Sequence, residues 1–364
     1  MSPQLGRGPI IEHEGLIPPV TARGPVWRAM PQSAELPRAR IQRSLWPTAL
    51  WATLAGMGVL AAGAAVLLLS TADVSWAQGT SWRAIRAGDA AGLRDAVVAG
   101  SESGLPLYPC RAAYAGSTLL GRYRADFAGC HIGYDSREVE AAPFEILGPS
   151  WTEISEGARA LVVGEVADAG DARPLSLRPV AVCRASYQGA THPGSWIAPD
   201  KGCSFGFGGR VVTSQNFTVL QAAPWMTWVP AMAATAGTAV TPLMEGAVKG
   251  GEEGGEPFYL CRAPTPRGVL AGKIKSTSPG CSVPLDGKEL VESRFELLMP
   301  RWASGAAGVG AVAAGREKAE LQFPCRAKKA NTLQPGRATD TRPGCRVGMQ
   351  STEVVLPDYD VLAQ

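Results

Sequence analysis

The stretch Cys110-Arg111-Ala112, followed after sixteen residues by Gly129-Cys130, decides the fold because it occurs four times in the chain. A glycine lies eleven residues past each first cysteine, and an aromatic residue lies thirty-four past it. The other copies begin at Cys183, Cys261 and Cys325 and end at Cys203, Cys281 and Cys345. Each copy closes on a similar segment: Phe144-Glu145-Ile146-Leu147, Phe217-Thr218-Val219-Leu220, Phe295-Glu296-Leu297-Leu298 and Tyr359-Asp360-Val361-Leu362. Internal repetition is therefore the strongest signal in the sequence.

The repeats predict an all-β chain of four small antiparallel units. Apolar and polar residues alternate around Cys261, as a strand requires. The 43 glycines and 29 prolines suit short strands joined by tight turns. Because each unit is at the small end of what folds alone, we expect adjacent repeats to pack as pairs. The predicted repeats span residues 82–150, 151–224, 225–300 and 301–364.

All eight cysteines lie in the repeats. Eight cysteines allow 105 pairings, but one fixed separation per unit favours one bridge per unit. The predicted disulfides are Cys110–Cys130, Cys183–Cys203, Cys261–Cys281 and Cys325–Cys345. Closing a loop of about 20 residues stabilises a small unit by roughly 3 kcal/mol. A metal site is not expected, because the chain lacks Cys-x-x-Cys pairs and histidine clusters, and no cofactor is predicted.

The chain begins with a segment of different composition. Residues 1–43 contain seven prolines and no periodicity, which predicts a disordered tail. Residues 45–69 carry no charge and are long enough to cross a bilayer, so residues 44–77 are interpreted as a transmembrane or signal segment. Permanent anchoring and cleavage after Ala77 both remain open. Either alternative places the repeats outside the cytoplasm: in a periplasm, at a cell surface or secreted.

Charge and histidine content narrow the classes of function. The formal net charge is +3, and the basic excess lies in residues 1–43, so a nucleic-acid partner is not expected. The three histidines, His13, His131 and His192, form no catalytic or metal-ligand grouping by spacing. No glycine-rich phosphate loop opens a helix. We therefore expect a protein without catalysis.

Two further repeated features predict packing within the units. An arginine follows each first cysteine, and an acid lies thirty-five positions past that cysteine in three units, which predicts a cross-strand ion pair. The acids are Glu145, Glu296 and Asp360, with Thr218 as the exception. Tryptophans follow the closing leucines and are expected to pack the junctions between units: Trp151, Trp225 and Trp302.

Taken together, these residues resemble the DM-nine repeat family, over residues from about 90 to 364. The likeness is best in the third unit, at Phe258-Tyr259, Ala271-Gly272-Lys273, Asp286-Gly287-Lys288-Glu289 and Phe295-Glu296-Leu297-Leu298. The resemblance implies compact all-β units in tandem pairs and, from the characterised members, mannose-binding lectin activity. Cysteine in the Cys-Arg-Ala strand is not general in that family and suggests a disulfide-stabilised, exported branch.

The family resemblance also implies a binding site. Its lectin members use a turn lysine and an acidic turn residue, which matches Lys273 with Glu252 or Glu253. The weaker versions are Arg122 with Glu102 and Arg337 with Glu317, and the second unit, with Ser195, is expected to be silent. A lysine and a carboxylate would supply the paired donors and acceptors that sugar hydroxyls need. The main hypothesis is therefore a carbohydrate-binding protein, and the resemblance implies mannose-type glycans as its ligands. The alternative is a cell-envelope structural or protein-interaction scaffold.

Overall fold

The computed structural model describes residues 81–154, 159–167, 177–233, 244–305, 307–308 and 310–364. These residues all lie in the second of two compact units, Leu69–Gln364. The predicted tail, the apolar run 45–69 and the possible cut after Ala77 lie outside the described residues. Within the described ranges, no helix is long and apolar enough to cross a membrane.

The described chain is almost entirely β, as predicted, and each repeat contributes seven strands. The first repeat holds β1 (Ser81–Ile85), the short 3-10 helix η1 (Ala91–Leu93), β2 (Gly100–Glu102), β3 (Leu105–Tyr114), β4 (Ser117–Tyr123), β5 (Cys130–Tyr134), β6 (Arg137–Ala141) and β7 (Phe144–Gly148). The second holds β8 (Trp151–Thr152), β9 (Val162–Ala167), β10 (Leu177–Tyr187), β11 (Ala190–Ile197), β12 (Cys203–Phe207), β13 (Arg210–Ser214) and β14 (Phe217–Leu220). The third holds β15 (Met226–Met232), β16 (Lys249–Glu253), β17 (Glu256–Thr265), β18 (Gly268–Ile274), β19 (Cys281–Leu285), β20 (Lys288–Glu292) and β21 (Arg294–Pro300). The fourth holds β22 (Trp302–Ser304), β23 (Gly315–Glu317), β24 (Glu320–Lys329), β25 (Thr332–Thr339), β26 (Cys345–Met349), β27 (Thr352–Leu356) and β28 (Tyr359–Leu362).

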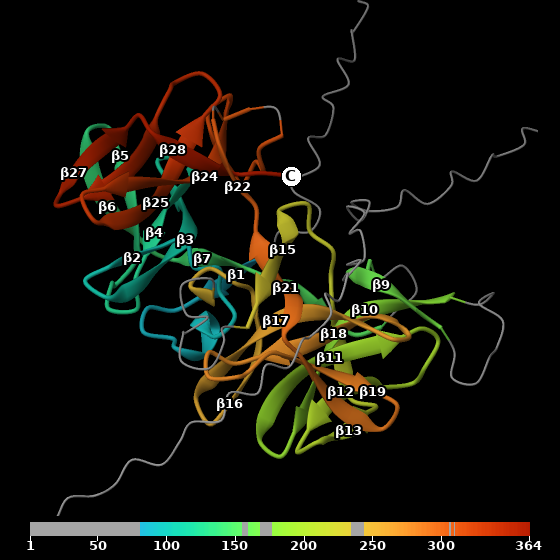
Figure 1. Ribbon diagram of the computed structural model, residues 1–364. Coiled ribbons are helices and arrows are strands. Elements are labelled where there is room, and N and C mark those ends of the chain that lie inside the picture. The colour runs from blue at the N-terminus through green and yellow to red at the C-terminus, as the bar shows by residue number, and fades with distance from the viewer. Residues whose placement is uncertain (1–80, 155–158, 168–176, 234–243, 306, 309) are drawn as a thin grey trace, which may run out of the picture. The chain divides into compact units, whose positions relative to one another are not determined.

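The repeats pair, but not only with their neighbours in sequence. One 14-stranded sheet combines the second and third repeats, as expected, whereas the other combines the first and the fourth. Figure 1 shows the teal strands β3 and β4 of the first repeat beside the red strands of the fourth. The strand order of each sheet is the same read from either end when equivalent strands are exchanged, so each pair has a pseudo-twofold arrangement. The prediction of adjacent pairing is therefore wrong for the outer repeats.

The pairing follows from strand edges that a single repeat leaves open. In the first sheet, β2 pairs with β25, β23 pairs with β4, and β27 pairs with β6. Every one of these contacts joins the first repeat to the fourth. An isolated repeat would expose these edges to aggregation, so a partner repeat is needed to cover them.

The recurring glycine and the two cysteines fix the centre of each repeat. All four predicted disulfides are present, with Cα–Cα distances of 5.8 to 6.0 Å. A Cβ atom at Gly121 would lie 2.2 Å from the His131 carbonyl oxygen. Glycine is thus required where β5 passes close to β4, and Gly194, Gly272 and Gly336 meet the same contact in the other repeats.

The predicted cross-strand ion pair is also confirmed. Arg111 Nε donates to Glu145 Oε2 at 2.6 Å, and the equivalent pairs are Arg262 with Glu296 and Arg326 with Asp360. Arg184, which faces Thr218, instead bonds to Asp95 at 3.0 Å.

A tryptophan lies beneath each of these arginines. The rings are those of Trp82, Trp151, Trp228 and Trp302, with the guanidinium carbon 4.2 to 4.8 Å from each centroid. The third repeat therefore uses Trp228 in this role. Trp225, predicted to pack a junction between units, is fully buried in a core cluster that also holds Leu147 of the first repeat and Leu362 of the fourth.

Reversing the charge of Glu296 tests this pair. Glu296→Lys should lower the free energy of unfolding by about 1–2 kcal/mol, because it places two cations on opposite positions of β17 and β21. Denaturant unfolding of the full chain measures the change. Glu292→Lys, on β20, is the matched control, and an equal loss in both variants would contradict the ion-pair interpretation.

Candidate functional site

The predicted cations occupy one position in the repeat, directly after the recurring glycine. Arg122, Lys273 and Arg337 lie in β4, β18 and β25, so their expected placement on turns is wrong. They are only 4%, 6% and 2% exposed. The physical reason is that the partner repeat of each pair packs against these side chains, at Gly348, His192 and Gly133 respectively.

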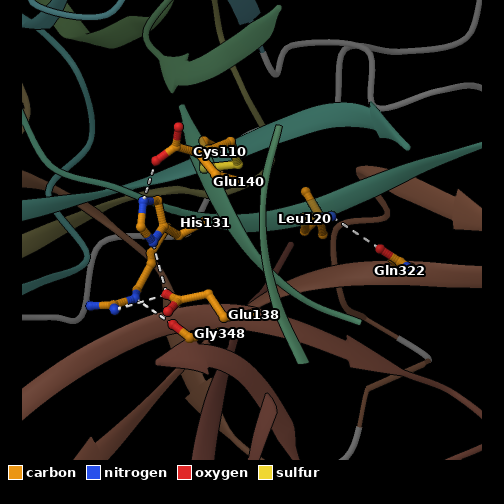
Figure 2. The surroundings of a disulfide bond; sticks show 9 residues. Cys110, Leu120, His131, Glu138, Glu140, Gln322 and Gly348 are labelled. Carbon is orange, nitrogen blue, oxygen red and sulfur yellow. Dashed lines mark hydrogen bonds and ion pairs between the residues drawn. A yellow bond between two sulfur atoms is a disulfide. The ribbon is translucent and has the colours of Figure 1, made fainter. Parts of the chain in front are cut away.

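Arg122 joins the first repeat to the fourth. Its Nη1 donates to Glu102 Oε2 at 3.1 Å, and its Nη2 to Glu138 Oε1 at 3.3 Å. Its Nε donates to the Gly348 carbonyl at 2.7 Å, and its Nη1 also to Gln334 Oε1 at 3.0 Å, both in the fourth repeat. In Figure 2 these two partners, Glu138 and Gly348, lie next to each other. The predicted contact with Glu102 is therefore present.

Arg337 repeats this arrangement from the opposite side of the sheet's pseudo-twofold axis. Its Nη1 donates to Glu317 Oε2 at 2.6 Å and its Nη2 to Glu353 Oε1 at 3.0 Å. Its Nε reaches back to the Gly133 carbonyl of the first repeat at 2.9 Å. Each arginine thus binds two carboxylates of its own repeat and one carbonyl of the partner repeat. The predicted pair of Arg337 with Glu317 is present.

Lys273 does not contact either predicted acid. Its Nζ lies 2.7 Å from His192 Nδ1 and 4.4 Å from the centroid of Phe258. Burial lowers the pKa of Lys273 to about 8. Glu253 instead accepts from Lys275 at 2.9 Å, while Glu252 pairs with an arginine outside this cluster. At this position, therefore, a lysine of the third repeat contacts an imidazole of the second repeat, in place of an arginine bonded to two carboxylates.

An outer cation, which sequence reasoning missed, completes each charged site. Arg124 Nη1 lies 2.8 Å from Glu102, Lys275 Nζ lies 2.9 Å from Glu253, and Arg342 Nη2 lies 3.4 Å from Glu317. The hydrogen bond from Lys275 lowers the pKa of Glu253 and keeps it an acceptor. We call these three groups the charged clusters. Arg124 and Lys275 lie two residues past the inner cation, a spacing that could have revealed them.

The cluster of the first repeat adds aromatic and imidazole groups. Arg124 stacks on Phe127, with 4.6 Å to the centroid, and Phe127 stacks on His131 at 4.0 Å. Figure 2 shows His131 between Glu138 and Glu140, with ring nitrogens at 2.8 and 3.0 Å from their carboxylates. Donors, acceptors and an apolar ring therefore converge at this cluster.

The second repeat has lost every charge of the cluster. Ser195 replaces the inner cation, and Ile197 replaces the outer one. Val166 and Val211 lie at the positions of the two acids. The result is a cavity of about 130 Å³ lined by these side chains together with Leu270 and Leu285 among others.

The fold and these sites define a class: an all-β protein built of repeat pairs, with charged clusters at the seam of each pair. The model of the DM9 repeat family matches residues 176–291, most of the second and third repeats. Residues 176–291 therefore belong to the DM9 repeat family, as the sequence indicated. The crystal structure of the nematode sperm cell motility protein MFP2B is similar at 14% identity, covering 78% of this chain and 96% of that one, with a TM-score of 0.16. No curated protein matches the chain.

Proposed function

We propose that this protein binds carbohydrate through its three charged clusters. The observation that carries the proposal is the recurrence of one partly exposed carboxylate held by an outer cation: Glu102 with Arg124, Glu253 with Lys275, and Glu317 with Arg342. A carboxylate accepts from a sugar hydroxyl, and a cationic nitrogen donates to the next one. Mannose-type glycans are the first to test, because the family resemblance points to them.

The clusters divide into structural and ligand-facing parts. The two inner arginines, Arg122 and Arg337, are nearly saturated by bonds inside the protein, so they orient the carboxylates from below. The outer pairs are more accessible: the Lys275 and Glu253 side chains are 19% and 37% exposed. Several weak sites on one chain raise avidity by orders of magnitude without new contacts.

The proposal places the protein outside the cytoplasm. Four disulfides indicate an oxidising environment. We propose that residues 45–69 either anchor the chain in a membrane or are removed with a signal sequence cut near Ala77.

A glycan array with the full chain, produced in an oxidising compartment, tests the proposal. Lys275→Ala combined with Arg124→Ala should reduce binding of mannose-type glycans about tenfold or more, because two of three clusters lose their outer donor. Arg137→Ala, which removes a 74% exposed arginine from the same repeat as Arg124, is the control and should bind as the wild type does.

The alternative function is a cell-envelope scaffold. The observation that favours it is that Arg122 and Arg337 each donate a hydrogen bond that joins the first repeat to the fourth. A folded wild-type chain that gives a blank array would exclude the carbohydrate proposal and leave the scaffold as the better function.

A further inference from the structure

We propose that the cavity of the second repeat is a separate binding site for a small, uncharged, mostly apolar molecule that carries one hydroxyl group, such as a phenol or a short alcohol. The cavity lies where the other repeats hold an arginine or lysine and two acids. This inference does not rest on carbohydrate binding at the charged clusters.

The cavity exists because a large side chain has been exchanged for a small one. At the equivalent positions, Arg122 and Arg337 fill the seam between two repeats, whereas Ser195 is too short to do so. Valines in place of the acids keep the walls apolar. The volume of about 130 Å³ is close to that of an apolar cavity of ~150 Å³ that takes up benzene. A single aromatic ring is therefore the right size.

One polar group inside the cavity gives it a preference for a ligand that carries a hydroxyl group. Ser195 is 1% exposed, and its Oγ donates to the Ala271 carbonyl at 2.8 Å. Since the only hydroxyl proton is used, the two lone pairs of Oγ are free to accept from a ligand hydroxyl. Ser204, also in the lining, shares its hydroxyl with Thr213 at 2.8 Å.

The charged residues of the lining are already paired with each other. Arg267 forms an ion pair with Asp286, and its Nε donates to the Ala167 carbonyl at 2.9 Å. A charged ligand would have to leave water for apolar walls without a free counter-charge, which is costly. A sugar would bury more hydroxyls than this cavity can satisfy. An apolar ring with one hydroxyl group carries no charge into the cavity and brings only one hydroxyl group that needs a partner.

Fluorine NMR of the full chain with 4-fluorophenol and fluorobenzene tests the proposal. We expect saturable binding of both probes, tighter for the phenol. Ser195→Ala keeps the cavity and should weaken 4-fluorophenol about fivefold, as loss of one hydrogen bond predicts, without weakening fluorobenzene. Ser195→Met should fill the cavity and abolish binding of both.

Ser276→Met, at an exposed position of the third repeat, is the matched control and should bind both probes as the wild type does. A wild-type chain that binds neither probe saturably would overturn the proposal, as would undiminished binding by a folded Ser195→Met variant. Neither outcome bears on the glycan array, whose variants, Arg124→Ala and Lys275→Ala, change residues that do not line the cavity.

Discussion

Arg337→Met should lower the free energy of unfolding by about 3–5 kcal/mol, the usual cost of breaking a buried ion pair by removing one partner. The arginine is 2% exposed, and its guanidinium bonds to Glu317, Glu353 and the Gly133 carbonyl. Methionine fills similar volume but supplies no donor. Two partly buried carboxylates of one repeat and a carbonyl of the other then lose their shared cation.

Denaturant unfolding, monitored on the disulfide-intact full chain, measures this loss. Arg137→Met is the matched control, because Arg137 is 74% exposed and 3.8 Å from Asp135. The control should change stability by no more than about 0.5 kcal/mol. If the two variants were equally stable, Arg337 would not join the first and fourth repeats in the way described.

The strand content, disulfides and ion pairs were predictable because each depends on spacing within one repeat. Arg262 and Glu296 are thirty-four residues apart in sequence, and the same spacing recurs wherever the same register recurs. A pattern of this kind needs no knowledge of long-range packing. The sequence therefore predicts the interior of a repeat well.

The partner of each repeat was not predictable in the same way. Strand β2 pairs with β25, and this pairing depends on which open strand edges meet in the folded chain. The residue pattern of an edge strand does not indicate which strand it pairs with. Burial of Lys273 was missed for a related reason. A lysine after a glycine suggests a turn, but here the glycine admits a crossing strand and the lysine is covered.

The loss of charge in the second repeat could be predicted only in part from the sequence. An alignment of the four repeats places Ser195 at the position of the inner cations, because each of these residues lies equally far past the first cysteine of its repeat. The acidic position does not align, since Glu102 lies eight residues before Cys110 whereas Val166 lies seventeen before Cys183. Only strand register shows that the cation and both acids were lost together.

His192 should make the paired second and third repeats sensitive to acid. Its side chain is fully buried and stacked on Phe205, and its Nε2 has no hydrogen-bond partner among the residues that the structure describes. Burial, and next the charge of Lys273, lower the pKa of His192 from 6.5 to about 4, although Glu253 acts in the opposite direction. The folded protein therefore keeps the imidazole neutral at pH values where the unfolded chain protonates it.

The sign of the effect follows from proton binding. Between pH 6.5 and 4 the unfolded state binds more protons than the folded state, so stability falls as the pH falls. The contribution of His192 is complete above pH 6.5, and its loss approaches about 3 kcal/mol near pH 4.

The measurement compares His192→Gln with the wild type by denaturant unfolding at pH 7 and at pH 4.5. Glutamine is the residue of the fourth repeat at this position, Gln334, and it does not titrate. Acidic groups elsewhere destabilise both proteins equally, so the difference between the two isolates His192. We expect the variant to lose less stability on acidification than the wild type. Parallel losses would mean that the imidazole is protonated in the folded protein, which would require Lys273 to be neutral or solvent to reach Nε2.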